Sequence, residues 1–78
     1  MISDKLKQCI LNELRIESFE ITPDTLANEI PGWDSLNHIN VITAIEKSFS
    51  IRFSAYDILK CQNIGDLQNL INKKSVQT

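Results

Sequence analysis

Several kinds of residue are scarce in this sequence, and each scarcity excludes a class of protein. The 78 residues include only two cysteines, Cys9 and Cys61, whose wide separation matches no disulfide-rich, zinc-binding or thiol-redox pattern. We therefore expect two free thiols and no metal site. Basic residues number 8 against 10 acidic ones, a net charge of −2, so no basic stripe is present that could neutralise the phosphates of a nucleic acid.

Long hydrophobic runs are also missing. Residues 1–14 mix charged and apolar side chains, unlike a signal peptide. No segment approaches the roughly 20 consecutive apolar residues of a membrane span. We expect a cytoplasmic protein that does not insert into membranes.

What the sequence does have is the composition of an ordinary globular domain. Hydrophobic residues make up 42% and charged residues 23%, which is typical of folded proteins. A chain of 8.9 kDa is long enough for one domain, residues 1–78, with a small core and no room for a deep enzyme cavity. We expect this domain to be monomeric.

Hydrophobic periodicity predicts an all-α fold. Apolar residues recur at steps of three and four, which predicts helices over about 3–16, 35–49, 55–60 and 64–73. The tail, 75–78, is expected to fray. Each helix is preceded by a residue suited to cap it: Ser3, Asp34 or Ser35, Ser54 and Asn63. Together the segments predict a small bundle of three main helices and one short one.

The second predicted helix carries the longest apolar pattern. We interpret five of its residues as one stripe that faces the core: Leu36, Ile39, Ile42, Ile45 and Phe49. Val41 lies beside the stripe and widens it.

A long loop, 17–34, separates the first two predicted helices. Pro23-Asp24 and Pro31-Gly32 mark turns in it, and its isolated apolar residues are expected to pin it to the helices. Its charge comes from five acids and no base: Glu17, Glu20, Asp24, Glu29 and Asp34. A loop of this length in so small a domain is often functional.

Residues 32–36, Gly-Trp-Asp-Ser-Leu, lie where this acidic loop meets the second predicted helix. The segment resembles the attachment motif of acyl carrier proteins, in which Asp-Ser-Leu opens the second helix. The resemblance covers nearly the whole chain, because further segments follow in the family's order: the Pro-Asp turn, Ala-Ile-Glu at 44–46, the apolar pair Ile51 and Phe53, and Asn-Ile-Gly-Asp-Leu at 63–67. It implies an acyl-carrier-protein-like bundle of three to four helices.

The resemblance also implies a function. In the family the serine of the motif, here Ser35, is esterified by 4′-phosphopantetheine, which a phosphopantetheinyl transferase moves from coenzyme A. The terminal thiol of this arm holds an acyl group as a thioester, so the protein is a non-catalytic carrier on which acyl-loading and acyl-processing enzymes act. Asp34 is then expected to help the transferase engage the site. Contacts with partner enzymes are expected at Leu36, Trp33, Asn40 and Thr43.

Physical considerations are compatible with this assignment. A serine in the first turn of a helix projects its hydroxyl outward, and an attached phosphodiester would be stabilised by the free N–H groups and the positive end of the helix. The carboxylate of Asp34 opposes that attraction, so we expect it to act in the modification encounter. The alternative is that Asp34 and Ser35 are only a good helix cap.

Several residues admit two interpretations. Asp34, Ser35 and His38 share one helix face, as a nucleophile, its base and an orienting group would. No Gly-rich oxyanion loop or strand-to-helix elbow accompanies them, so we do not expect hydrolysis, and a lone histidine does not make a metal site.

Trp33 either contacts partners or seals the loop onto the bundle. Three further residues either line an acyl-binding crevice or belong to the ordinary core: Tyr56, Ile58 and Leu59.

The outward positions of the second predicted helix depart from the family pattern. Carriers of primary fatty-acid synthesis usually have a strongly acidic second helix. Here the outward positions include a single acid, Glu46, and its charge is offset by that of Lys47. The full set of outward residues is Asn37, His38, Asn40, Thr43, Glu46, Lys47 and Ser48. This predicts a dedicated pathway, such as one for a polyketide or a specialised lipid, with an aminoacyl or peptidyl carrier as an alternative. A small helical interaction module without a prosthetic group is the alternative from another class.

Overall fold

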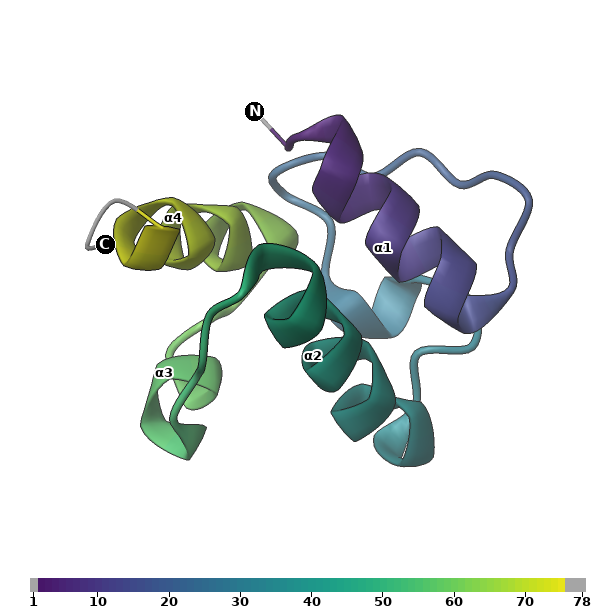
Figure 1. The fold of residues 1–78 in the computed structure, drawn as a ribbon. Helices are drawn as coiled ribbons and strands as arrows, with labels where there is room; N and C mark the ends of the chain where they lie inside the picture. Colours follow the sequence, from purple (N-terminus) through teal and green to yellow (C-terminus); the bar gives the residue numbers. More distant parts are fainter. Residues whose placement is uncertain (1, 76–78) are drawn as a thin grey trace.

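The computed structural model describes residues 2–75, and within them the only regular elements are helices (Figure 1). In chain order these are α1 (Asp4–Leu14), the 3-10 helix η1 (Ala27–Glu29), α2 (Ser35–Phe49), α3 (Ala55–Leu59) and α4 (Ile64–Ser75). The predicted all-α fold is confirmed. Of the tail expected to fray, Ser75 belongs to α4, and 76–78 lie outside the described residues.

The ends of the helices are set by their caps. Ser3 caps α1, because its Oγ accepts a hydrogen bond from the N–H of Leu6 at 3.2 Å. The helix ends at Leu14, two residues earlier than predicted, since Arg15 has a left-handed φ of 58° and its N–H donates to the carbonyl of Asn12. The bounds of α2 agree with the prediction, whereas α3 ends one residue earlier and α4 two residues later.

The core lies between α1, α2 and α4, with α1 packed directly against α2. In Figure 1, α1 and α3 lie on opposite sides of α2. The buried apolar side chains come from all three long helices and from the loop: Ile2, Leu6, Ile10, Leu11, Ile21, Ile30, Trp33, Val41, Ile45, Ile64, Leu67 and Ile71. Both cysteines are free and partly buried.

The environment of α2 corrects the predicted apolar stripe. Val41 and Ile45 are completely buried, whereas Leu36 is 84% and Ile39 69% exposed. The reason is helical geometry, because each step of three residues stops about 60° short of a full turn. Three such steps place Ile45 about 180° around the helix from Leu36. The first half of the stripe therefore faces solvent and only its second half reaches the core.

The loop between α1 and α2 is held against α4 by backbone hydrogen bonds. The carbonyls of Thr25 and Pro23 accept from the N–H groups of Ile64 and Gly65 at 2.8 and 2.9 Å, so the loop satisfies the first donors of α4. Gly65 is required here, because a Cβ would lie 2.7 Å from the carbonyl oxygen of Pro23. The short η1 within this loop was not predicted, since three residues are too few to show a hydrophobic period.

Candidate functional site

The segment before α2 is a tight turn that fixes where the helix starts. The N–H of Trp33 donates to the carbonyl of Ile30 at 3.1 Å, and Gly32 has a φ of 86°. These are the features of a type II turn with Pro31 and Gly32 at its centre, where the second central position favours glycine. Nδ2 of Asn37 donates to the carbonyl of Gly32 at 2.8 Å, so the turn is tied to the first turn of α2.

Asp34 caps α2, and Ser35 is its first residue. Oδ1 of Asp34 accepts from the N–H of Asn37 at 2.9 Å, which decides between the two predicted caps. Ser35 is exposed, and its hydroxyl makes no hydrogen bond to any of residues 2–75. The N–H groups of Ser35 and Leu36 also lack an acceptor in this part of the chain, as is usual in a first helical turn. An outward hydroxyl therefore lies beside two free donors.

Three of the predicted contact residues share one exposed face of α2. Leu36, Asn40 and Thr43 are all exposed, and their spacing places them within about 60° around the helix. Trp33, the fourth, is only 7% exposed. Its burial favours the interpretation in which it seals the loop onto the bundle, and it leaves little of the indole for a partner to touch.

Trp33 and His38 are joined by a hydrogen bond that was not predicted. The indole Nε1 donates to Nδ1 of the imidazole at 3.0 Å, and the ring centroids are 6.1 Å apart. A buried indole N–H usually has an acceptor, and without one it costs about 1–3 kcal/mol. The rule predicts that Trp33 has an acceptor if it is buried, but the sequence does not single out His38 among the acceptors nearby.

This hydrogen bond also bears on the interpretation of His38 as a catalytic base. Nδ1 must be unprotonated to accept from the indole, so neutral His38 carries its proton on Nε2. Neither nitrogen is then available to accept a proton from the hydroxyl of Ser35. The nucleophile-and-base interpretation therefore gains no support from the geometry.

Three hollows adjoin the Trp33–His38 pair. The first, about 530 Å³, lies at the surface beside Ser35 and is lined by both side chains of the pair. The second, about 480 Å³, lies between α2 and α3, and its apolar walls come from Ile39, Ile42, Phe53, Ile58 and Leu59. The third, called the interior cavity below, has a volume of only about 60 Å³, is partly open to solvent beside Gln62, and is again lined by both Trp33 and His38. Since one water occupies about 30 Å³ in the liquid, this cavity holds roughly two water-sized groups.

Helix α3 presents apolar side chains to solvent. Tyr56 is 68% and Leu59 81% exposed, so neither belongs to the core. Ile58 is partly buried and lines both the groove between α2 and α3 and the interior cavity. For Ile58 and Leu59 the structure therefore favours the crevice over the core, whereas Tyr56 is exposed and does not line the groove.

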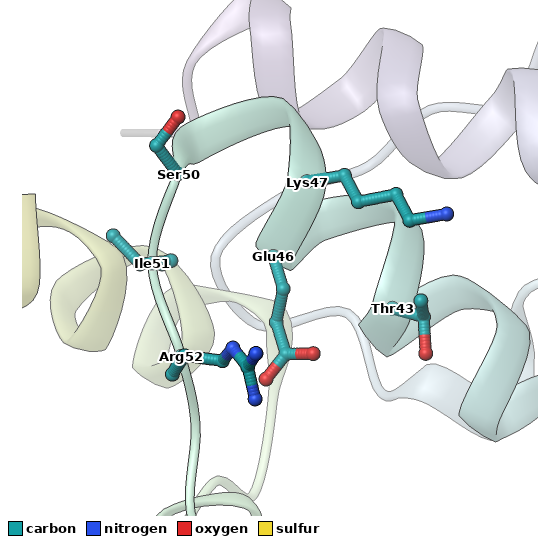
Figure 2. A pocket seen from close by; sticks show the side chains of 6 residues that line it. All are labelled: Thr43, Glu46, Lys47, Ser50, Ile51 and Arg52. Carbon is teal, nitrogen blue, oxygen red and sulfur yellow. The ribbon is translucent and has the colours of Figure 1, made fainter.

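A fourth hollow, about 660 Å³, is larger than these three and lies at the opposite end of α2 from Ser35; Figure 2 shows the residues that line it. Its lining is mostly polar: Thr43, Glu46, Lys47, Ser50, Ile51 and Arg52. Oε2 of Glu46 accepts from the N–H of Phe53 at 2.8 Å, which ties the connector after α2 back to the helix. The open, polar walls do not suit an apolar cargo, so size alone does not identify the functional site.

The remaining chemistry of the described chain is limited. Burial raises the pKa of the Cys61 thiol, with the nearby carboxylates of Asp66 and Asp57 acting in the same direction, so the thiol is protonated at neutral pH. Within residues 2–75, no three His, Cys, Asp or Glu side chains are grouped to hold a metal ion. No helix in that range is long and apolar enough to cross a membrane.

Comparisons with known proteins show what the whole chain is similar to. A family model described as "Phosphopantetheine attachment site" matches residues 4–71. The chain is 30% identical over 73 residues to an acyl carrier protein of Solidesulfovibrio magneticus, covering 94% of both chains. It is also similar to the solution NMR structure of a holo acyl carrier protein from Geobacter metallireducens, with a TM-score of 0.87 and 35% identity over 95% of this chain and 85% of the other.

Proposed function

The chain belongs to the acyl carrier protein family, which has a phosphopantetheine attachment site, and we propose that Ser35 is the residue to which its phosphopantetheine is attached. The observation that carries this proposal is the position of Ser35. It is the exposed first residue of α2, it lies in the Asp-Ser-Leu motif, and its hydroxyl has no partner among residues 2–75. The segment that the family model matches includes it.

The groups around Ser35 fit a phosphodiester. The N–H groups of Ser35 and Leu36 are free to donate to phosphate oxygens, and they lie at the positive end of a helix of 15 residues. The negative charge of Asp34 is nearby, but one of its oxygens already accepts the N–H of Asn37. When bound, the group supplies a terminal thiol that holds the cargo as a thioester.

The residues around Ser35 have different roles in presenting it to partner enzymes. Asp34 fixes the start of α2 and thereby the position of the Ser35 hydroxyl, and its free carboxylate oxygen is available to a phosphopantetheinyl transferase. Leu36, Asn40 and Thr43 form the face against which acyl-loading and acyl-processing enzymes dock. In this proposal the partner enzymes carry out the catalysis and the chain is their substrate.

Intact-protein mass spectrometry tests the attachment. After incubation with a phosphopantetheinyl transferase and coenzyme A, the protein should gain the mass of one arm. Ser35→Ala should abolish the gain, whereas Ser18→Ala, at an exposed serine of the loop, should leave it unchanged. No gain in the unaltered protein would instead favour a helical interaction module without a prosthetic group.

The charge of the docking face points to a dedicated biosynthetic pathway, such as one for a polyketide or a specialised lipid. The exposed face of α2 has no acidic residue among Leu36, Asn40 and Thr43, and Lys47 adds a positive charge. Long-range attraction to a basic enzyme surface is therefore weak. Docking relies instead on apolar contact and shape, and its rate should vary little with salt.

Adding acids to this face tests the choice of pathway. Asn40→Asp with Lys47→Glu should raise activity with fatty-acid-synthesis enzymes and make it sensitive to salt. Asn37 is left unaltered because its side chain holds the turn at Gly32. High activity of the unaltered protein with those enzymes, falling steeply as salt rises, would contradict a dedicated pathway.

A further inference from the structure

The Trp33–His38 hydrogen bond separates the surface beside Ser35 from the interior of the bundle. Both side chains line the surface hollow next to Ser35, and both line the interior cavity of about 60 Å³. The indole is 7% exposed and donates to the imidazole at 3.0 Å. A group that enters this cavity directly from the hollow beside Ser35 must therefore displace one of these two side chains.

Displacing His38 has a different consequence for different cargo. The indole N–H of Trp33 would lose its acceptor while remaining buried, which is strongly unfavourable. A saturated hydrocarbon cannot accept a hydrogen bond, and the small cavity allows it to bury little apolar surface in return. A cargo with a carbonyl or hydroxyl oxygen can replace Nδ1 of His38 as the acceptor.

The other walls of the cavity offer no buried donor of this kind. Ile42, Ile58 and Leu67 are apolar, and the two amide side chains in the lining, Gln62 and Asn63, are exposed and partly exposed to solvent. The thiol of Cys61 already donates to the carbonyl of Asp57 at 3.5 Å. Among the described residues, the indole N–H is therefore the buried donor at the boundary between Ser35 and the interior.

We propose that Trp33 and His38 form a gate that admits acyl cargo bearing an acceptor oxygen, such as a 3-oxo or 3-hydroxy group, in preference to saturated cargo. The inference rests on the proposed attachment at Ser35 and adds the class of cargo. His38 is the moving part, because it is only partly buried and lines all three hollows, whereas Trp33 is packed in the core. Saturated cargo stays in the apolar groove between α2 and α3, where no polar group has to lose a partner.

The single tryptophan and single histidine make the gate directly observable by NMR. A transferase loads the protein from butanoyl or 3-oxobutanoyl coenzyme A, a matched pair that differs only by a carbonyl oxygen. The intact mass of each product is measured first. We expect the 3-oxobutanoyl form to shift the indole N–H and imidazole resonances, and the butanoyl form to leave both as they are in the protein with an unloaded arm.

Two variants identify the groups responsible. We expect the 3-oxobutanoyl form to have a higher thermal midpoint of unfolding than the butanoyl form, because only its oxygen can accept from the indole N–H. Trp33→Phe removes the donor but keeps an aromatic ring, so this difference between the two loaded forms should disappear. Tyr56→Phe, at an exposed residue outside the gate, should preserve that difference. Equal resonance shifts with both cargoes, or none with 3-oxobutanoyl, would overturn the gate while the mass gain still supports attachment. Absence of the mass gain would contradict the carrier function itself and this inference with it.

Discussion

The two halves of the apolar stripe on α2 have similar aliphatic residues and opposite environments. Leu36 and Ile39 in the first half of the stripe are 84% and 69% exposed, whereas Ile45 in the second half is completely buried. Ile45 stabilises the bundle, and the exposed pair forms an apolar surface next to Ser35 of the kind that marks interaction sites. The side chains of the two halves are therefore chemically similar. The position of each residue around the helix decides whether its side chain stabilises the core or is available for contact with partners.

Truncation in the buried half should have the largest effect. Ile45→Ala leaves a cavity in the core between α1 and α2 and should lower the free energy of unfolding by about 2–5 kcal/mol. Leu36→Ala, at the matched exposed position, should change it by less than about 0.5 kcal/mol. Urea denaturation followed by circular dichroism measures both. Similar losses for the two variants would contradict the division of α2.

Truncation in the exposed half should instead affect partner enzymes. Leu36→Ala removes the most exposed large apolar side chain of the domain beside Ser35 and should lower kcat/KM of a phosphopantetheinyl transferase about tenfold, which corresponds to about 1.4 kcal/mol. Leu26→Ala, at a partly exposed leucine of the loop, is the control and should leave kcat/KM unchanged. A rate unaffected by the loss of Leu36 would show that the exposed half is not the contact surface.

The cap at the start of α2 should have an intermediate effect, and two variants separate its roles. Asp34→Ala removes the acceptor for the N–H of Asn37 and should cost about 1 kcal/mol in the free energy of unfolding. Asp34→Asn keeps a capping oxygen, so stability should be retained while modification by the transferase slows. If both variants lose stability equally and are modified at the normal rate, Asp34 is only a structural cap.

Helix α3, on the other side of the groove, should show the smallest effect, because polar contacts rather than burial hold it. The backbone N–H of Ser54 and then the ammonium of Lys74, 3.1 Å away, hold the pKa of Asp57 below its ordinary value of 3.8. A lowered pKa in the folded state stabilises the protein at neutral pH, and this contribution is lost as pH falls through the folded-state pKa.

The consequence is measurable by amide exchange of α3 as a function of pH. Exchange in α3 should speed up relative to α1 as the solution is acidified below about pH 4. Asp57→Asn should exchange faster at neutral pH and show no such acid-dependent step, while Glu17→Gln in the exposed loop should behave like the unaltered protein. An unchanged acid-dependent step in Asp57→Asn would assign it to another carboxyl group.

Helix content was predictable because it depends on local signals. Capping side chains lie where the helices begin: Ser3 before α1, Asp34 before α2 and Ser54 before α3. The buried face of α2 was not predicted correctly, since steps of three residues look periodic in the sequence but rotate around the helix. The early end of α1 depends on the left-handed backbone of Arg15, for which the side chain provides no signal.

The site was predictable where it depends on a contiguous motif and less so where it depends on packing. Asp34, Ser35 and Leu36 follow from Asp-Ser-Leu at a helix start, and the structure exposes all three. The bond between Trp33 and His38 depends on how the loop folds over α2, so their residue types alone left a partner contact and a seal equally plausible. The role of Asn37 in holding the turn at Gly32 was missed for the same reason.

Attachment of the arm at Ser35 is tested most directly by peptide mapping of the modified protein. Tryptic cleavage after Arg15 and Lys47 yields the peptide 16–47, in which Ser18 and Ser35 are the only serines. Fragment ions that divide the peptide between these two serines assign the added mass. We predict the mass of one phosphopantetheine on fragments that contain Ser35 and none on those that end before it. The same mass on Ser18, or on any other peptide, would contradict Ser35 as the attachment residue.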